Sequence, residues 1–231
     1  MKILSWNTGL TERVKFEQEI YRYVKEFLEQ PDSAAVLQQI PLLDPQCGWE
    51  VHTAYRDLLS LFPKESYCLL QNNTYNRGRI IMETVLLTKM QGVRALDPSY
   101  YPGKTATNRE IAAELPGGLT LLGLHARTGR DNVLYLRSVV GKADVIMGDF
   151  NAGDYPESEN RELFRTLLPD HVCLLNLPTR RVTGPAREAS RESCIDHVFV
   201  KRELVTRCTE VKVDRRTDYS DHYPVLLKID L

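Results

Sequence analysis

The sequence lacks paired cysteines, a basic excess and a long apolar run, and each absence argues against a class of protein. Its 231 residues include five scattered cysteines and no Cys-x-x-Cys pair, so we expect buried, reduced thiols and no structural zinc site. Lysines and arginines number 30 against 31 acidic residues, which gives a formal net charge of −1. General electrostatic attachment to nucleic acid usually needs a basic excess, so this balance disfavours it without excluding local binding of one phosphate.

The apolar segments are all short. No run approaches the roughly 20 residues that a membrane-spanning helix needs, and residues 1–7 are too few and too polar for a signal peptide. We therefore expect no membrane span and a cytoplasmic protein, and no obligate protein partner is evident. Hydrophobic residues make up 42% of the chain, which allows a large core. Without repeats, low-complexity tracts or a linker, the sequence predicts a single domain over residues 1–231.

Apolar spacing predicts many strands and few helices. Helical periodicity indicates helices over residues 12–29 and 51–62, and further helices near 132–140 and 159–168. Strands are predicted at 2–6, 34–40, 67–70, 80–88, 110–115, 119–125, 144–147, 172–175, 195–200 and 225–229. Short turns between several of these segments favour antiparallel hairpins. Two mostly antiparallel sheets, packed face to face with helices outside, would bury every apolar segment.

Polar side chains recur where predicted strands begin or end. They are Asn7, His125, Asp149, Asn151, Asp196, His197, Asp221 and His222. Any one of them is explained as a turn former, a helix cap or a satisfied polar residue. Their recurrence at several strand ends favours a single cleft that gathers them. Asp and Asn oxygens without cysteine favour Mg²⁺ or Mn²⁺ as the bound ion, and nearby histidines would then position or protonate a phosphate.

Five short motifs strengthen this interpretation because they occur in a characteristic order. They are Ser5-Trp6-Asn7, Leu37-Gln38-Gln39, Gly148-Asp149-Phe150-Asn151, Ile195-Asp196-His197 and Ser220-Asp221-His222-Tyr223-Pro224. In this order they resemble the motif series of the endonuclease/exonuclease/phosphatase superfamily. That superfamily includes abasic endonucleases, pancreatic deoxyribonuclease, neutral sphingomyelinases, inositol-polyphosphate phosphatases and tyrosyl-DNA phosphodiesterases. The resemblance spans almost the whole chain and implies a four-layer α/β sandwich with divalent-metal-dependent phosphoesterase activity.

The resemblance also implies roles for individual residues. Asn7 would be a metal-site or phosphate-orienting amide, and Asp221 would lie near the metal. Asp149 would orient or deprotonate the attacking water, and Asn151 would hold the phosphate or that water. The remaining roles fall to two histidines and an aspartate. His222 would contact the phosphoryl oxygens, Asp196 would fix the tautomer of His222, and His125 would serve as the acid for the leaving oxygen. A histidine at position 125 resembles the deoxyribonuclease and sphingomyelinase branches more than the abasic endonucleases.

One position departs from the family pattern. The second motif normally ends in a metal-binding glutamate, and this chain has Gln39 there, which can coordinate but carries no charge. Three explanations stay open: a weakened or non-catalytic protein, another carboxylate such as Glu83 or Glu50 in its place, or a deliberately introduced inactivating substitution. The favoured function is a nuclease-like phosphoesterase acting on a phosphate-ester substrate. A phospholipid headgroup or an inositol phosphate is an alternative substrate.

The residues that would bind the substrate are arginines. Residues 178–193 form the longest stretch without a regular pattern, and loops of that length inside a compact domain are often functional. Its four arginines, Arg180, Arg181, Arg187 and Arg191, are the candidates for substrate binding. They suit nucleic acid, inositol phosphate or lipid headgroups equally, and they also fit a solvated surface loop. The rival class of function is a binding module that holds a phosphorylated ligand or a protein partner without turnover.

Overall fold

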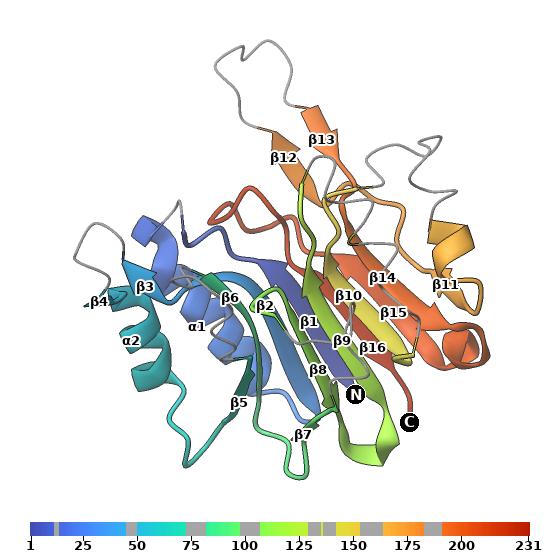
Figure 1. Ribbon diagram of the computed structural model, residues 1–231, viewed down its shortest axis with the longest axis horizontal. Helices are drawn as coiled ribbons and strands as arrows, with labels where there is room; N and C mark the ends of the chain where they lie inside the picture. The colour runs from blue at the N-terminus through green and yellow to red at the C-terminus, as the bar shows by residue number, and fades with distance from the viewer. Residues whose placement is uncertain are drawn as a thin grey trace.

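Two six-stranded sheets form the centre of the molecule (Figure 1). The structure is a computed structural model of residues 1–231, and it describes all of them except 12–13, 45–49, 73–81, 98–106, 129–134, 136–141, 153–163 and 183–190. The first sheet has the order β15-β16-β1-β2-β6-β5, with β1 (Lys2–Asn7), β2 (Ser33–Pro41), β5 (Cys68–Gln71), β6 (Met82–Thr88), β15 (Cys208–Val213) and β16 (Val225–Ile229).

The second sheet has the order β11-β14-β10-β9-β8-β7. Its strands are β7 (Arg94–Ala95), β8 (Glu110–Glu114), β9 (Thr120–His125), β10 (Val145–Asp149), β11 (His171–Cys173) and β14 (Asp196–Lys201). Each sheet contains one parallel pair, β1 with β2 and β9 with β10, and the other pairings are antiparallel. The expected pair of mostly antiparallel sheets is therefore confirmed.

The layer between the sheets is apolar because alternate side chains of each strand point into it. Ile3, Val36 and Leu86 come from the first sheet, and Ile111 and Val145 come from the second. The sheets approach so closely at Gly123 that an added Cβ would lie 2.3 Å from Val36 Cγ1. Glycine is required there for steric reasons, since any side chain would push the sheets apart.

Two helices cover the outer face of the first sheet (Figure 1). They are α1 (Glu17–Leu28), which follows the short 3₁₀ turn η1 (Val14–Phe16), and α2 (Thr53–Leu61). Ile20, Val24 and Leu28 form the buried stripe of α1, at the helical spacing seen in the sequence. On the outer face of the second sheet, residues 164–167 are helical and Phe164 packs against Phe150 and Phe199. The helix expected near 132–140 lies almost wholly outside the described residues.

The structure corrects two expectations. First, β15 was not predicted, because its half-exposed sequence carries charged residues and shows no apolar run. Second, the stretch 178–193 was expected to be an irregular loop, yet its two ends pair as a hairpin of β12 (Arg180–Val182) and β13 (Arg191–Ser193). Figure 1 shows this hairpin projecting beyond the ends of β10 and β14.

The remaining described elements are small, namely β3 (Leu43–Asp44), β4 (Glu50–Val51) and the 3₁₀ turns η4 (Pro116–Gly118) and η5 (Arg202–Arg207). None of the helices in the described ranges is long and apolar enough to cross a membrane.

The topology brings the functional candidates to one edge of the sandwich. Parallel strands end at the same side of a sheet, so the pairing of β1 with β2 ends at Asn7 and Gln38, and the pairing of β9 with β10 ends at His125 and Asp149. The antiparallel strand β14 begins at the same edge, because Asp196 pairs with Asp149. The candidate site therefore forms where the ends of the two sheets meet.

Candidate active site

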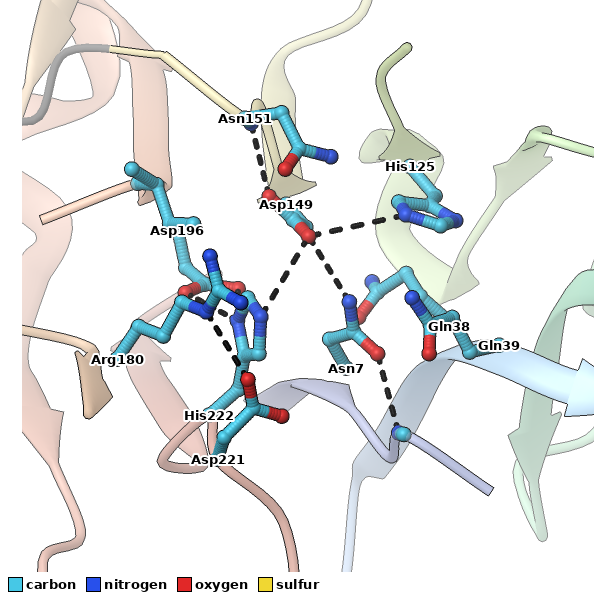
Figure 2. A network of polar contacts seen from close by, with 12 residues as sticks. Asn7, Gln38, Gln39, His125, Asp149, Asn151, Arg180, Asp196, Asp221 and His222 are labelled. Atoms are coloured by element: carbon cyan, nitrogen blue, oxygen red, sulfur yellow. Dashed lines mark hydrogen bonds and ion pairs between the residues drawn. The ribbon is translucent and has the colours of Figure 1, made fainter. Parts of the chain in front are cut away.

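Asp149 lies at the centre of the site and joins the two sheets (Figure 2). Its Oδ2 accepts a 2.9 Å hydrogen bond from Nδ2 of Asn7, which belongs to the first sheet. Its Oδ1 accepts a 2.8 Å hydrogen bond from the backbone N–H of Asn151. The same Oδ2 lies 3.7 Å from Nε2 of His125 and 3.8 Å from Nε2 of His222. One buried carboxylate oxygen thus faces both histidines and an amide.

The backbone around Asp149 has unusual conformations that fix this arrangement. Gly148 has φ of 146°, and a Cβ there would lie 1.9 Å from the carbonyl oxygen of Leu124. Asn151 has φ of 47°, a left-handed conformation that asparagine tolerates better than most residues, and its side chain donates to the carbonyl of Ala126 at 2.9 Å. The strand end and the following turn are therefore held in one conformation, which aims the Asp149 carboxylate across the gap between the sheets.

His222 and Asp196 form the second half of the site. Nδ1 of His222 lies 2.9 Å from Oδ2 of Asp196, so His222 Nε2 is left to face Asp149. The backbone of His222 is held by Trp6, whose Nε1 donates to its carbonyl at 3.0 Å. The hydroxyl of Thr179 accepts from the backbone N–H of Asp196 at 3.0 Å. Burial alone would lower the pKa of His222, but the Asp196 and Asp149 carboxylates outweigh it and raise the pKa to about 9.

His125 has the opposite electrostatic character. Burial lowers the pKa of His125 to about 3, and the positive charges of Arg109 and His222 add to the effect. Arg109 precedes β8 and donates from Nη1 to the carbonyls of His125 (3.3 Å) and Ala126 (3.4 Å), which fixes the end of β9. The sequence interpretation missed Arg109. Its position directly before a strand that pairs with the strand ending at His125 was the available signal.

The candidate metal position lies beside Asn7, where Figure 2 shows Gln38 and Gln39 on the side away from His222. Gln39 sits at a β-bulge with φ of 58°, and its Oε1 accepts from the Thr11 hydroxyl at 3.2 Å. Gln38 pairs with Asn7 and is completely buried, and among the described residues its Oε1 has no hydrogen-bond partner. An orphaned amide oxygen near a buried carboxylate suits a hard cation or a water bound to it. The donor set therefore fits Mg²⁺ or Mn²⁺.

The two glutamates considered as substitutes for the missing carboxylate lie elsewhere. Glu83 shares a face of β6 with Val85 and Leu87, which pack under the helices, whereas Asn7 points between the sheets with Ile3. Glu50 is exposed on β4. Among the described residues, Asp149, Asp196 and His222 have ligand atoms within 4.8 Å of one another, and Asp149 is the member that bonds Asn7.

Asp221 and Arg180 lie at the rim of the site (Figure 2). Nε of Arg180 donates to Oδ2 of Asp221 at 3.0 Å. Arg181 donates from Nη2 to the carbonyl of Ser220 at 3.1 Å, and its guanidinium lies 5.1 Å from the ring centre of Tyr223. The structure therefore brings Arg180 and Arg181 to the site. Arg187 and the side chain of Arg191 are outside the described part of the chain.

Comparison with known proteins identifies the family to which the chain belongs. Residues 5–222 match the Endonuclease/Exonuclease/phosphatase family. No curated protein sequence matches the chain. Among solved structures, the 3′-5′ exonuclease NExo from Neisseria meningitidis has a TM-score of 0.67 at 20% identity, and each chain is covered in full.

Two further solved structures have the same fold. The endonuclease domain of TRAS1, a telomere-specific non-LTR retrotransposon, has a TM-score of 0.68 at 15% identity, with 100% of this chain and 98% of that chain covered. An AP endonuclease from Archaeoglobus fulgidus has a TM-score of 0.67 at 15% identity, with both chains covered in full. The matched residues include the first four motifs and Ser220, Asp221 and His222 of the fifth, and the chain is a member of the endonuclease/exonuclease/phosphatase family.

Proposed function

We propose that the protein is a hydrolase that cleaves a phosphoester by in-line attack of water, assisted by Mg²⁺ or Mn²⁺. One observation carries the proposal: Oδ2 of Asp149 is bonded to Asn7 and faces Nε2 of both His125 and His222 within 3.8 Å. A buried carboxylate beside two imidazole groups could act as a base toward water and stabilise charge on phosphoryl oxygens, and this supports phosphoester hydrolysis.

Each residue has a role in the proposed reaction. Asp149 accepts a proton from the attacking water, and the Asn151 amide holds that water or a phosphoryl oxygen. The new oxygen–phosphorus bond forms as the bond to the leaving oxygen breaks. His222, protonated and oriented by Asp196, donates from Nε2 to a phosphoryl oxygen, where negative charge grows. A bound divalent ion would neutralise further charge on the phosphoryl oxygens.

His125 was expected to be the acid for the leaving oxygen, and its environment refines this role. Because its pKa is about 3, the imidazole is neutral at physiological pH and can donate a hydrogen bond to the leaving oxygen, although it is a poor source of a proton. The leaving oxygen would then take its proton from solvent. In this proposal His125 stabilises the leaving oxygen, and His222 supplies the positive charge.

Asn7, Gln38 and Gln39 would hold the ion on the first sheet, together with Asp149 on the second. The arginines Arg180, Arg181, Arg187 and Arg191 would bind the substrate. We propose a nuclease-like substrate, because NExo is described as an exonuclease and TRAS1 as an endonuclease, and each shares this fold over its full length or nearly so. Phospholipid headgroups and inositol phosphates are the alternatives to screen.

The test is hydrolysis of bis-(p-nitrophenyl) phosphate with Mn²⁺ or Mg²⁺ by the natural chain, Asp149→Asn and His222→Ala. We expect turnover by the natural chain that EDTA abolishes, and none by either variant at an unchanged melting temperature. Turnover that survives in both variants would refute the proposed site. Nicking of plasmid DNA, compared with release of a phospholipid headgroup or of inositol phosphate, then identifies the substrate class.

A second candidate function is a binder of a phosphorylated ligand without turnover. The neutral Gln39 favours it, since a metal-binding position without charge weakens the hold on the ion. The completeness of the set Asp149, Asp196 and His222 opposes it. A melting temperature raised by the phosphorylated ligand, with no hydrolysis of any ester tested, would support the binder over the hydrolase.

A further inference from the structure

The strand β12 pairs with the segment that carries His222. Arg180 and His222 form an isolated antiparallel bridge, flanked by hydrogen bonds from Arg181 N to Asp221 O and from Tyr223 N to Thr179 O, both 2.7 Å. This is the non-hydrogen-bonded type of pair, in which the side chains leave on the same face and lie closest together. Arg180 therefore extends beside His222 into the site, as Figure 2 shows.

The guanidinium of Arg180 is anchored through one of its donors. Nε bonds Oδ2 of Asp221 at 3.0 Å, and the side chains are 36% and 20% exposed. Within the described part of the chain, the Nη groups of Arg180 make no hydrogen bond. A guanidinium has five N–H donors in a planar fork, so the remaining ones can face two oxygens of a phosphate at once.

The carboxylate of Asp221 is already engaged in this ion pair. Its ligand oxygens are outside the group of Asp149, Asp196 and His222 that could surround an ion, and Oδ2 is held by Arg180. Asp196 is likewise bonded to His222. Asp149 is then the acidic residue left for a cation, and its partners on the first sheet are uncharged amides.

These charges make the site more attractive to an anion than a site with a glutamate at position 39 would be. Gln39 lacks one negative charge, and Arg180 adds one positive charge beside the phosphate position. The missing charge at position 39 weakens the attraction for a divalent ion, and the guanidinium of Arg180, which is paired with Asp221, attracts phosphoryl oxygens.

We propose that Arg180 is a phosphate-binding residue of the catalytic centre and that Asp221 is its positioning residue, in place of a metal ligand. A weakly bound metal ion would stabilise the phosphoryl oxygens less, and the guanidinium supplies part of the positive charge needed there. This inference rests on the proposed phosphoester chemistry at the same site, and it reassigns Asp221 from the role that the family resemblance implied.

The first test measures Mn²⁺ affinity by isothermal titration calorimetry in the absence of substrate. We expect Asp221→Asn and Arg180→Gln to bind Mn²⁺ within about twofold of the natural chain, whereas Asp149→Asn loses binding by tenfold or more, about 1.4 kcal/mol. Weakening by tenfold or more in Asp221→Asn would make Asp221 a metal ligand and overturn the assignment.

The second test measures binding of inorganic phosphate in EDTA by ³¹P NMR, which needs neither metal nor turnover. We expect Arg180→Gln to weaken phosphate binding about tenfold, and Arg180→Lys to weaken it less, because lysine keeps the charge and loses the fork. Asp221→Asn should weaken it severalfold, with recovery in Asp221→Glu. The ion pair of Arg94 with Glu114 (2.7 Å), on strands of the second sheet remote from the site, provides the control, and Arg94→Gln should change nothing.

The two tests separate this inference from the proposed function. Phosphate binding that depends on Arg180, in a chain that hydrolyses no ester, would support the inference and refute the hydrolase. Hydrolysis with phosphate affinity unchanged in Arg180→Gln would support the hydrolase and refute the inference.

Discussion

Nδ1 of His222 lies 2.9 Å from Oδ2 of Asp196, and both side chains are buried. The two residues are 26 positions apart; Asp196 begins β14 of the second sheet and His222 lies just before β16 of the first, so only the packed sandwich brings them together. The contact fixes the ring orientation and stabilises the protonated imidazole, because a carboxylate beside it favours the charged form. The proposed phosphate contact of His222 depends on this pair.

Replacing either member of this pair should impair turnover in different ways. His222→Ala should abolish metal-dependent hydrolysis, whereas Asp196→Asn should retain the imidazole and reduce kcat by about two to four orders of magnitude, as loss of a base-orienting carboxylate does elsewhere. With its pKa near 9, His222 loses its proton as the pH rises, so activity should fall above pH 9 in the natural chain and at lower pH in Asp196→Asn. A pH–rate profile checks this, and identical alkaline limbs would contradict it.

The uncharged residue at position 39 should limit metal affinity. Gln39→Glu places a carboxylate at the β-bulge beside Asn7, and we expect Mn²⁺ to bind at least tenfold more tightly, about 1.4 kcal/mol. Calorimetric titration with Mn²⁺ measures the change. Gln30→Glu is the matched control, since Gln30 is exposed before the other end of β2 and bonds Lys2. An equal gain in both variants would mean that the effect is general and that Gln39 does not face the metal.

Glu83 should make the stability of the fold depend on pH. It is 1% exposed, neither carboxylate oxygen has a hydrogen-bond partner in the described part of the chain, and burial raises its pKa to about 7. The folded state therefore holds a proton that the unfolded chain releases near pH 4.5. Its contribution is fully favourable below pH 4.5 and is lost as the pH rises through 7.

Glu83→Gln removes this titration. At pH 8 the variant should be more stable than the natural chain, by up to about 3 kcal/mol, and at pH 4.5 the two should be alike. Urea unfolding at both pH values measures the difference, with the exposed Glu26→Gln as the control. A constant difference across this pH range would show that Glu83 does not titrate as described.

Gly123 should be needed for the two sheets to pack. Gly123→Ala would place a Cβ 2.3 Å from Val36 Cγ1, so we expect a loss of about 1–3 kcal/mol in the free energy of unfolding. Adding Val36→Ala makes space for the new methyl group, and the double variant should be more stable than the sum of the single effects predicts. Additive losses, measured by urea unfolding of all four proteins, would argue against this contact.

The amino-acid sequence by itself determined the elements and most of the site residues. Alternating and helical apolar patterns predicted α1, α2 and most strands of both sheets, because burial of one face imposes a period on the sequence. The ordered motifs indicated Asn7, Asp149, Asp196 and His222, and His125 was proposed as a polar residue at the end of a predicted strand; the structure brings the five side chains to one edge of the sandwich.

Only the tertiary structure decided what each of these residues contacts. Periodicity shows which face of a strand is buried and leaves open which strand lies beside it, so the pairing of Arg180 with His222 could not be predicted. The same limit applies to charge. His125 and His222 both lie next to apolar strand segments in the sequence. In the structure, burial beside Arg109 keeps His125 neutral, while two carboxylates keep His222 protonated. Protonation depends on distances between segments remote in the chain, and those distances exist only in the folded protein.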